Sequence, residues 1–140
     1  MILALVLMLS ASDVSYDLTG IVTNRSGIPM TYKSQNVKPV RVTVAETLLA
    51  TPHPGIFYNS KASTTGYEGS IEYATSCDRS RAHGTYRLAF HVTAEKNEGS
   101  CTYTGDSACE SRCSVKVTPK SCARGSDCQV EFAYTIGNQR

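Results

Sequence analysis

The sequence predicts an all-β fold, an antiparallel β-sandwich with a disulfide-rich C-terminal extension. Apolar and polar residues alternate with a period of two in several segments, which is the pattern of strands with one face on a core. No window shows the apolar stripe of an amphipathic helix. Segments rich in Gly, Pro, Ser and Asn separate the alternating stretches at intervals of roughly ten residues, as in sandwiches rather than in folds that alternate strands with helices.

Three segments carry the strand prediction. In residues 39–44 the even positions are apolar and the odd positions are polar. Residues 85–93 repeat the pattern more strongly, and residues 128–136 repeat it near the end of the chain. The side chains expected on the core face of these last two strands are Tyr86, Leu88, Phe90, Val92, Cys128, Val130, Phe132, Tyr134 and Ile136. The sulfur of Cys128 is therefore predicted on the core side.

Loops are expected where Gly and Pro gather, because Gly tolerates positive φ and Pro fixes φ. The segments of this kind are residues 24–27, 51–55, 63–70, 78–84 and 96–100.

The composition fits one soluble globular domain. The chain has 140 residues, of which 41% are hydrophobic and 19% are charged, and a chain of this length can bury a core of its own. The formal net charge of +2 lacks the strong basic excess that nucleic-acid binders gather on one face. We therefore expect no nucleic-acid partner and no stable insertion into a membrane.

Residues 1–12 predict an export signal. An apolar run from Ile2 to Leu9 precedes the small residues Ser10-Ala11-Ser12, a pattern suited to cleavage before Asp13. No Lys or Arg precedes the run and the segment is short for a signal, so a buried first strand of the mature protein stays open as an alternative. The run is too short to cross a bilayer as a helix, which takes about 20 residues. A secreted or periplasmic location is expected.

All six cysteines lie in the second half of the chain. An even number of cysteines behind an export signal predicts a framework of three disulfides, for which fifteen connectivities are allowed. A four-sulfur zinc site is the alternative, but neither Cys109-x3-Cys113 nor Cys122-x5-Cys128 has the two-residue spacing that lets two thiolates hold one ion. We therefore predict disulfides, and no metal or other cofactor. The cysteines are Cys77, Cys101, Cys109, Cys113, Cys122 and Cys128.

A soft boundary falls near Gly99, beyond which the density of cysteines rises. We expect a signal in residues 1–12, a β-sandwich core in 13–98 and a cysteine-rich extension in 99–140. Alternation resumes in Val115-Lys116-Val117 and again after Cys128. The extension is therefore expected to add strands or a crosslinked cap to the same domain.

Four short segments occur in an order that is more informative about the fold than any one of them alone. They read GIVTNRSGIP at 20–29, VRVTV at 40–44, TGYEGSI at 65–71 and GTYRL at 84–88. This order resembles the carboxypeptidase-regulatory-like domains, in which a turn closed by Gly-x-Pro, a V-x-V strand, a T-x-x-x-G turn and a strand opened by G-T-Y succeed one another. Bacterial immunoglobulin-like domains of adhesins carry a similar order, and the resemblance covers residues 14–94.

The resemblance implies an immunoglobulin-like or transthyretin-like sandwich that serves as an accessory, adhesive or spacer unit of exported proteins and brings no catalytic residues. Two features depart from the family pattern. A polar insert, residues 33–36, lengthens the segment between Pro29 and Val40, and the six cysteines are not part of the family signature.

Two candidate binding or modification features stand out. Asn24-Arg25-Ser26 is an N-glycosylation sequon on an expected turn, although asparagine is also favoured there because it tolerates turn geometry. The segment CDRSRAHGTYR carries the densest positive charge of the chain. Its guanidinium groups suit carboxylate, sulfate or phosphate groups, which makes an anionic glycan a candidate partner. A solvated loop is the plainer explanation of the same charges. The candidate anion-binding residues are Arg79, Arg81 and Arg87. The tyrosines considered for stacking on sugar rings are Tyr58, Tyr67 and Tyr103.

No catalytic site is predicted. Gly105-Asp106-Ser107 matches the residues around the nucleophile of trypsin-like serine proteases, but Ala108 replaces the glycine that follows, and the chain is too short for the two barrels that complete a triad. No pattern brings the three histidines together into a metal or catalytic site. The histidines are His53, His83 and His91.

The sequence thus predicts a secreted, disulfide-stabilised, non-catalytic β-sandwich that acts as a binding, adhesion or surface-structural module, with a protein or glycan at a surface as its partner. Self-association is the second hypothesis, in which an uncleaved N-terminal apolar segment inserts as an added strand into a neighbouring subunit of a filament or shell. The third hypothesis is a small secreted enzyme or enzyme inhibitor, with Ser107 or His91 as the residues to test.

Overall fold

Nine strands make up the described part of the chain. The computed structural model describes residues 14–50, 53–77, 82–105, 112–119 and 127–137, and no helix occurs in these ranges. The strands are β1 (Ser15–Arg25), β2 (Met30–Lys38), β3 (Thr47–Leu48), β4 (Gly55–Tyr58), β5 (Tyr67–Cys77), β6 (Ala82–Val92), β7 (Asn97–Gly105), β8 (Cys113–Pro119) and β9 (Asp127–Gly137).

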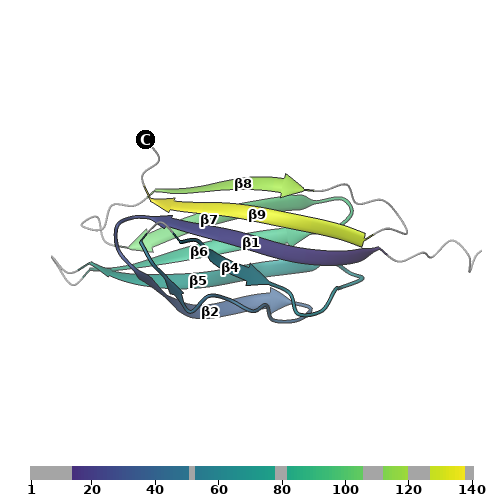
Figure 1. Cartoon of the computed structure of the whole chain (residues 1–140), viewed down its shortest axis with the longest axis horizontal. Coiled ribbons are helices and arrows are strands. Elements are labelled where there is room, and N and C mark those ends of the chain that lie inside the picture. Colours follow the sequence, from purple (N-terminus) through teal and green to yellow (C-terminus); the bar gives the residue numbers. More distant parts are fainter. Residues whose placement is uncertain (1–13, 51–52, 78–81, 106–111, 120–126, 138–140) are drawn as a thin grey trace, which may run out of the picture.

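The strands form two sheets, as the alternation predicts. One sheet has four strands in the order β4-β1-β9-β8, and the other has five in the order β3-β2-β5-β6-β7. The strands pair antiparallel except for β1 and β9, which pair in parallel along their whole length, so the prediction of an antiparallel sandwich is wrong for this pair. Figure 1 shows β1 and β9 in front, with β5, β6 and β7 behind them. The all-β prediction is confirmed.

The core lies between the two sheets, where the alternation of β6 and β9 places it. All four expected side chains of β6 and all five of β9 are buried, and the sulfur side of Cys128 faces inward as predicted. Aromatic rings meet across the interior: Phe57 stacks on Phe90 at 5.4 Å between ring centroids, and Phe90 lies 6.0 Å from Phe132. Burying such side chains is the main favourable term in folding.

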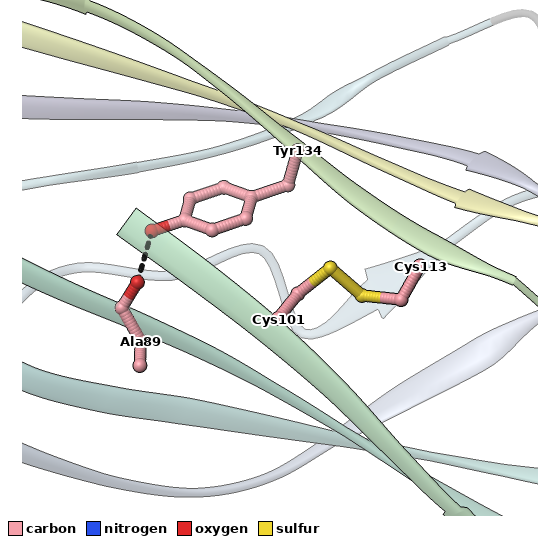
Figure 2. Close-up of a disulfide and its surroundings, with 4 residues drawn as sticks. All are labelled: Ala89, Cys101, Cys113 and Tyr134. Atoms are coloured by element: carbon pink, nitrogen blue, oxygen red, sulfur yellow. Dashed lines mark hydrogen bonds between the residues drawn. A yellow bond between two sulfur atoms is a disulfide. The ribbon is translucent and has the colours of Figure 1, made fainter. Parts of the chain in front are cut away.

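A disulfide joins an edge strand of one sheet to an edge strand of the other sheet. Cys101 of β7 bonds to Cys113 of β8, with their Cα atoms 5.9 Å apart. Close by, the hydroxyl of Tyr134 donates a hydrogen bond of 2.7 Å to the carbonyl of Ala89 across the interior, as Figure 2 shows. Because β7 and β8 are the outer strands of their sheets, the disulfide closes this side of the sandwich.

The opposite side is closed by residues 39–44, which were expected to be a strand but are not. The side-chain amide of Gln35 pairs with the backbone of Val42, accepting from its N–H at 2.8 Å and donating to its carbonyl at 2.9 Å. Thr43 exchanges two backbone hydrogen bonds with Tyr58 of β4. The side chain of Gln35 and the backbone of Tyr58 thus hold the segment between the sheets. Of its three valines, Val42 is buried and Val40 is exposed.

The polar insert expected at residues 33–36 is part of β2 instead. This stretch pairs with β5 from Ser34 onward, after a bulge that follows Tyr32. Its side chains are exposed or half-buried, and the side chains of β2 that reach the core are Met30 and Val37, with Tyr32 packed against its edge. A strand so polar on both faces carries little of the alternation that identifies strands in a sequence.

The described strands of the cysteine-rich part of the chain belong to the two sheets. The boundary expected near Gly99 falls inside β7, and β9 lies in the middle of its sheet between β1 and β8. The rise in cysteine density therefore does not mark the end of the sandwich, because β9 supplies five of the buried core side chains.

The turn after β1 crosses from one sheet to the other. β1 belongs to the four-stranded sheet and β2 to the five-stranded one, so residues 26–29 form a connection between layers rather than a hairpin. Gly27 has φ of 80°, a conformation that glycine adopts without strain.

Candidate binding surface on the five-stranded sheet

A row of charged side chains crosses the outer face of the five-stranded sheet. Lys38 of β2 lies opposite Glu68 of β5, which lies opposite His91 of β6, which lies opposite Glu98 of β7. Alternation puts these four side chains on the face away from the core, because their neighbours along each strand point inward. The row alternates in character from cation to anion to imidazole to anion.

The closest contact within the row joins His91 and Glu68. Nδ1 of His91 lies 3.5 Å from Oε2 of Glu68, and the two side chains are 33% and 62% exposed. An ion pair forms only when the imidazole is protonated, and at this exposure it adds little to stability. Both groups remain accessible to a ligand.

Open hollows surround His91. One of about 350 Å³ is lined by Ala89, His91, Glu98 and Ser100 over Phe90 and Gly99. A second of about 300 Å³ runs from His91 past Glu68 to Thr65, Thr93 and the Lys38-Pro39 corner, and a third of about 280 Å³ lies between His91 and Asn36. The three hollows meet at His91.

A second row of side chains runs beside the charged row across the same strands. It reads Asn36, Ser70, Ala89 and Ser100, each opposite the next. Ser70 is buried, whereas Asn36 and Ser100 are exposed and line two of the hollows. The exposed amide and hydroxyl offer hydrogen-bond donors and acceptors to a ligand.

Within the described ranges, no three His, Cys, Asp or Glu side chains come close enough together to hold a metal ion. Sequence reasoning named His91 but missed Lys38, Glu68 and Glu98. Only strand register brings those residues to His91, and the sequence does not state register.

Of the three candidate anion-binding arginines, Arg87 lies among the described residues. Arg87 lies exposed on the outer face of β6, opposite Glu72 of β5 and Thr102 of β7. Arg79 and Arg81 lie outside the described residues. Arg87 therefore lies opposite a residue that carries a carboxylate, on the same face of the sheet as His91.

The three histidines are not brought together. His83 and His91 both lie on β6 but are eight residues apart, about 26 Å along a strand. His53 is exposed in the segment before β4. Ser107 lies outside the described residues.

Two of the three candidate tyrosines are engaged in the fold. Tyr67 is buried and its hydroxyl donates to the carbonyl of Lys61. Tyr103 is half-buried and packs on Tyr86 with ring centroids 4.6 Å apart. Tyr58 alone of the three is exposed, at 47%.

The sequon asparagine is buried. Asn24 is 1% exposed, and its amide nitrogen donates to the carbonyls of Ile28 and Leu48 at 2.7 and 3.1 Å. Its side-chain oxygen accepts from the backbone N–H and the hydroxyl of Ser26. A glycan on this nitrogen would displace hydrogen bonds that hold the turn. Asn24 itself lies in β1 rather than on the expected turn, and its side chain bonds to the turn that follows the strand.

The structure describes the side chains of three cysteines. Cys101 and Cys113 are bonded to each other, and Cys128 is also disulfide-bonded. The zinc alternative needs Cys113 as a thiolate, and its bond to Cys101 removes it from that site. Cys77 ends β5, with only its backbone described, and Cys109 and Cys122 lie outside the described residues.

Comparison with protein-family models, curated proteins and solved structures finds no significant match to this chain. None of the described residues forms a helix long and apolar enough to span a membrane.

Proposed function

We propose that the chain is an exported, non-catalytic β-sandwich that binds a protein or a glycan at a surface through the outer face of its five-stranded sheet. The observation that carries the proposal is the convergence of three open hollows on His91, beside the exposed carboxylate of Glu68. Ligand sites combine a concave surface with a few polar groups of fixed position, and paired strands hold these groups rigidly.

Export is supported by the disulfide chemistry. Disulfides persist in oxidising compartments and are rare where glutathione and thioredoxin keep thiols reduced. Cys101–Cys113 and the disulfide at Cys128 both fit a secreted or periplasmic chain, as does the apolar run at Ile2 to Leu9. The transthyretin-like or immunoglobulin-like character of the sandwich is part of the same proposal, and the order of motifs in residues 20–88 supports it.

A binding screen with matched variants tests the function. The probes are a printed array of neutral, sialylated and sulfated glycans and a panel of immobilised extracellular proteins. For any probe bound, His91→Ala combined with Glu68→Ala should weaken binding about tenfold or more. The control is Lys116→Ala, exposed on β8 of the other sheet, which should leave binding unchanged. Equal binding by wild type and the double variant would place recognition elsewhere.

Self-assembly is a second candidate, favoured by the edge at β4. This four-residue strand ends the four-stranded sheet, and its outward side chains Ile56 and Tyr58 are 48% and 47% exposed, with Leu49 at 54% in the segment before the strand. Because Thr43 already bonds to the backbone of Tyr58, these exposed apolar side chains favour packing against another copy of the chain rather than addition of a strand. Sedimentation over a range of concentrations should then show oligomers that Ile56→Lys dissociates. A monomer at every concentration would remove this candidate.

A further inference from the structure

We propose that two copies of the chain pack face to face through the outer surface of the four-stranded sheet, related by a two-fold axis that crosses the strands at Ile21. This pairing rests on the self-association candidate, to which it gives a face and a geometry, and it is independent of recognition at the five-stranded sheet. The outward side chains of β4, β1, β9 and β8 build the face. Their pattern of apolar and charged groups selects a second copy as the partner.

An apolar row crosses the middle of this face. Ile56 of β4 lies opposite Ile21 of β1, which lies opposite Ala133 of β9. Ile56 and its neighbour Tyr58 on the same face are exposed, and Ile21 and Ala133 are half-buried. Lys116 of β8 ends the row opposite Ala133, and because it is exposed on an edge strand its long side chain can turn into solvent. Apolar groups gathered on an outer sheet face mark an interaction surface.

Charges of opposite sign flank the apolar row. Asp17 of β1 and Glu131 of β9 lie on one side of it, toward the start of both strands, and Arg25 at the end of β1 lies on the other side. Alternation places all three side chains on the outer face. Among the described residues, neither Glu131 nor Arg25 has an ion-pair partner. The face is therefore acidic at one end, apolar in the middle and basic at the other end.

The acidic end of the face is hollowed. Asp17, Thr19, Gln129 and Glu131 line an open hollow of about 240 Å³. Oδ1 of Asp17 accepts a hydrogen bond of 3.1 Å from the side-chain amide of Asn59, which holds this carboxylate in place. Two carboxylates and two polar side chains around an open hollow suit a guanidinium group, which donates hydrogen bonds from a planar fork.

A two-fold axis along the apolar row brings the hollow and the arginine together. Asp17 is four residues before Ile21 on β1 and Arg25 is four residues after it, so the rotation sets Arg25 of one copy over Asp17 of the other copy. The same contact is repeated at the other end of the interface, because contacts across an isologous interface come in pairs. Ile21 meets its own equivalent on the axis. A two-fold axis parallel to the strands would instead set like charges against each other.

The area of the face predicts a weak dimer. β1 is about 36 Å long and the four strands span about 15 Å across, so two copies would bury about 1,000 Å² of surface in total. An interface of this size lies at the lower limit for specific association. Such a dimer leaves the two five-stranded sheets on opposite outer sides, each with its own His91 surface. Two ligand surfaces on one dimer raise the apparent affinity for a multivalent target.

Charge reversal tests this geometry, because two single variants should each weaken the dimer and restore it when they are mixed. In sedimentation over a range of concentrations, Arg25→Glu and Glu131→Arg should each dimerise about tenfold or more weakly than the unaltered chain. An equimolar mixture should dimerise about as tightly as the unaltered chain, since each heterodimer contains one original contact and one contact with both charges exchanged. Recovery on mixing also shows that both variants are folded.

Lys96→Glu is the matched control. Lys96 is exposed between β6 and β7, and its replacement makes the same change in charge as Arg25→Glu, so dimerisation should stay unchanged. A dimer that resists both charge reversals, or that mixing does not restore, would keep self-association and overturn this geometry. A chain that stays monomeric at every concentration would overturn both and leave the face to a different partner. Neither result affects binding at the five-stranded sheet, which the variants of His91 and Glu68 test separately.

Discussion

At the scale of single residues, Asn24 is a buried amide whose nitrogen and oxygen both have hydrogen-bond partners. Its side chain ties the end of β1 to the turn at Ile28 and to Leu48 of β3. Buried amides are tolerated when every donor and acceptor is paired, and their loss leaves the partners unsatisfied. The sequence shows the sequon at Asn24 but not the burial that gives the residue its structural role.

Replacing Asn24 should therefore destabilise the fold. Asn24→Ala leaves the carbonyls of Ile28 and Leu48 without these donors and should lower the free energy of unfolding by about 1–3 kcal/mol. Urea denaturation measures the change. The control is Asn36→Ala on the exposed face of β2, which should cost less than about 0.5 kcal/mol. In a peptide map of the folded protein, Asn24 should be unglycosylated, and a glycan there would contradict its buried position.

Two buried tyrosines determine how the stability of the fold should change at alkaline pH. Burial raises the pKa of Tyr134 and of Tyr73 well above the ordinary value, with Tyr32 adding to the effect at Tyr73. The folded state thus keeps these phenols neutral where the unfolded chain ionises, so their contribution to stability is complete below about pH 10 and is lost as pH rises further. Thermal melts from pH 8 upward should show Tm falling beyond about pH 10, and less steeply in Tyr134→Phe. An equally steep fall in that variant would contradict the assignment to Tyr134.

At the scale of elements, the alternation of apolar and polar residues identified the strands that have one face on the core and the other in solvent. β6 and β9 are of this kind, and their inward faces could be named residue by residue. The pattern failed where a non-local partner decides the structure. Residues 39–44 also alternate, but they pair with the Gln35 side chain, and β2 is a strand because β5 lies beside it. The same limit hid the charged row, since no local signal places Lys38 or Glu68 near His91.

The pairing of β1 with β4 depends on a glycine. Gly20 lies opposite Phe57, and a Cβ at this position would come within 2.0 Å of the Phe57 ring. That ring stacks on Phe90 in the core. Gly20→Ala should therefore push the ring out of place and lower the free energy of unfolding by about 1–3 kcal/mol in urea denaturation. Thr19→Ala, on the outward face of the same strand, should cost less than about 1 kcal/mol, and similar costs for both would argue against the close approach.

At the scale of the whole molecule, the sandwich is closed on one side by the segment at Val42 and on the other by a covalent bond. The Cys101–Cys113 disulfide closes a loop with a sequence separation of 12 residues. Replacing both cysteines by alanine should lower the free energy of unfolding by about 3 kcal/mol, because the unfolded chain regains the freedom that the crosslink removes. Calorimetry should show a single transition at lower temperature. An unchanged Tm would mean that packing between β7 and β8 holds this side without the bond.

The central claim, an exported and fully crosslinked sandwich, is tested most directly by the intact mass of the protein from its natural source, measured before and after reduction. We predict a chain that begins near Asp13 and gains two hydrogens for each of three disulfides formed by its six cysteines. A chain that retains Met1 to Leu9 and gains no mass on reduction would contradict the claim.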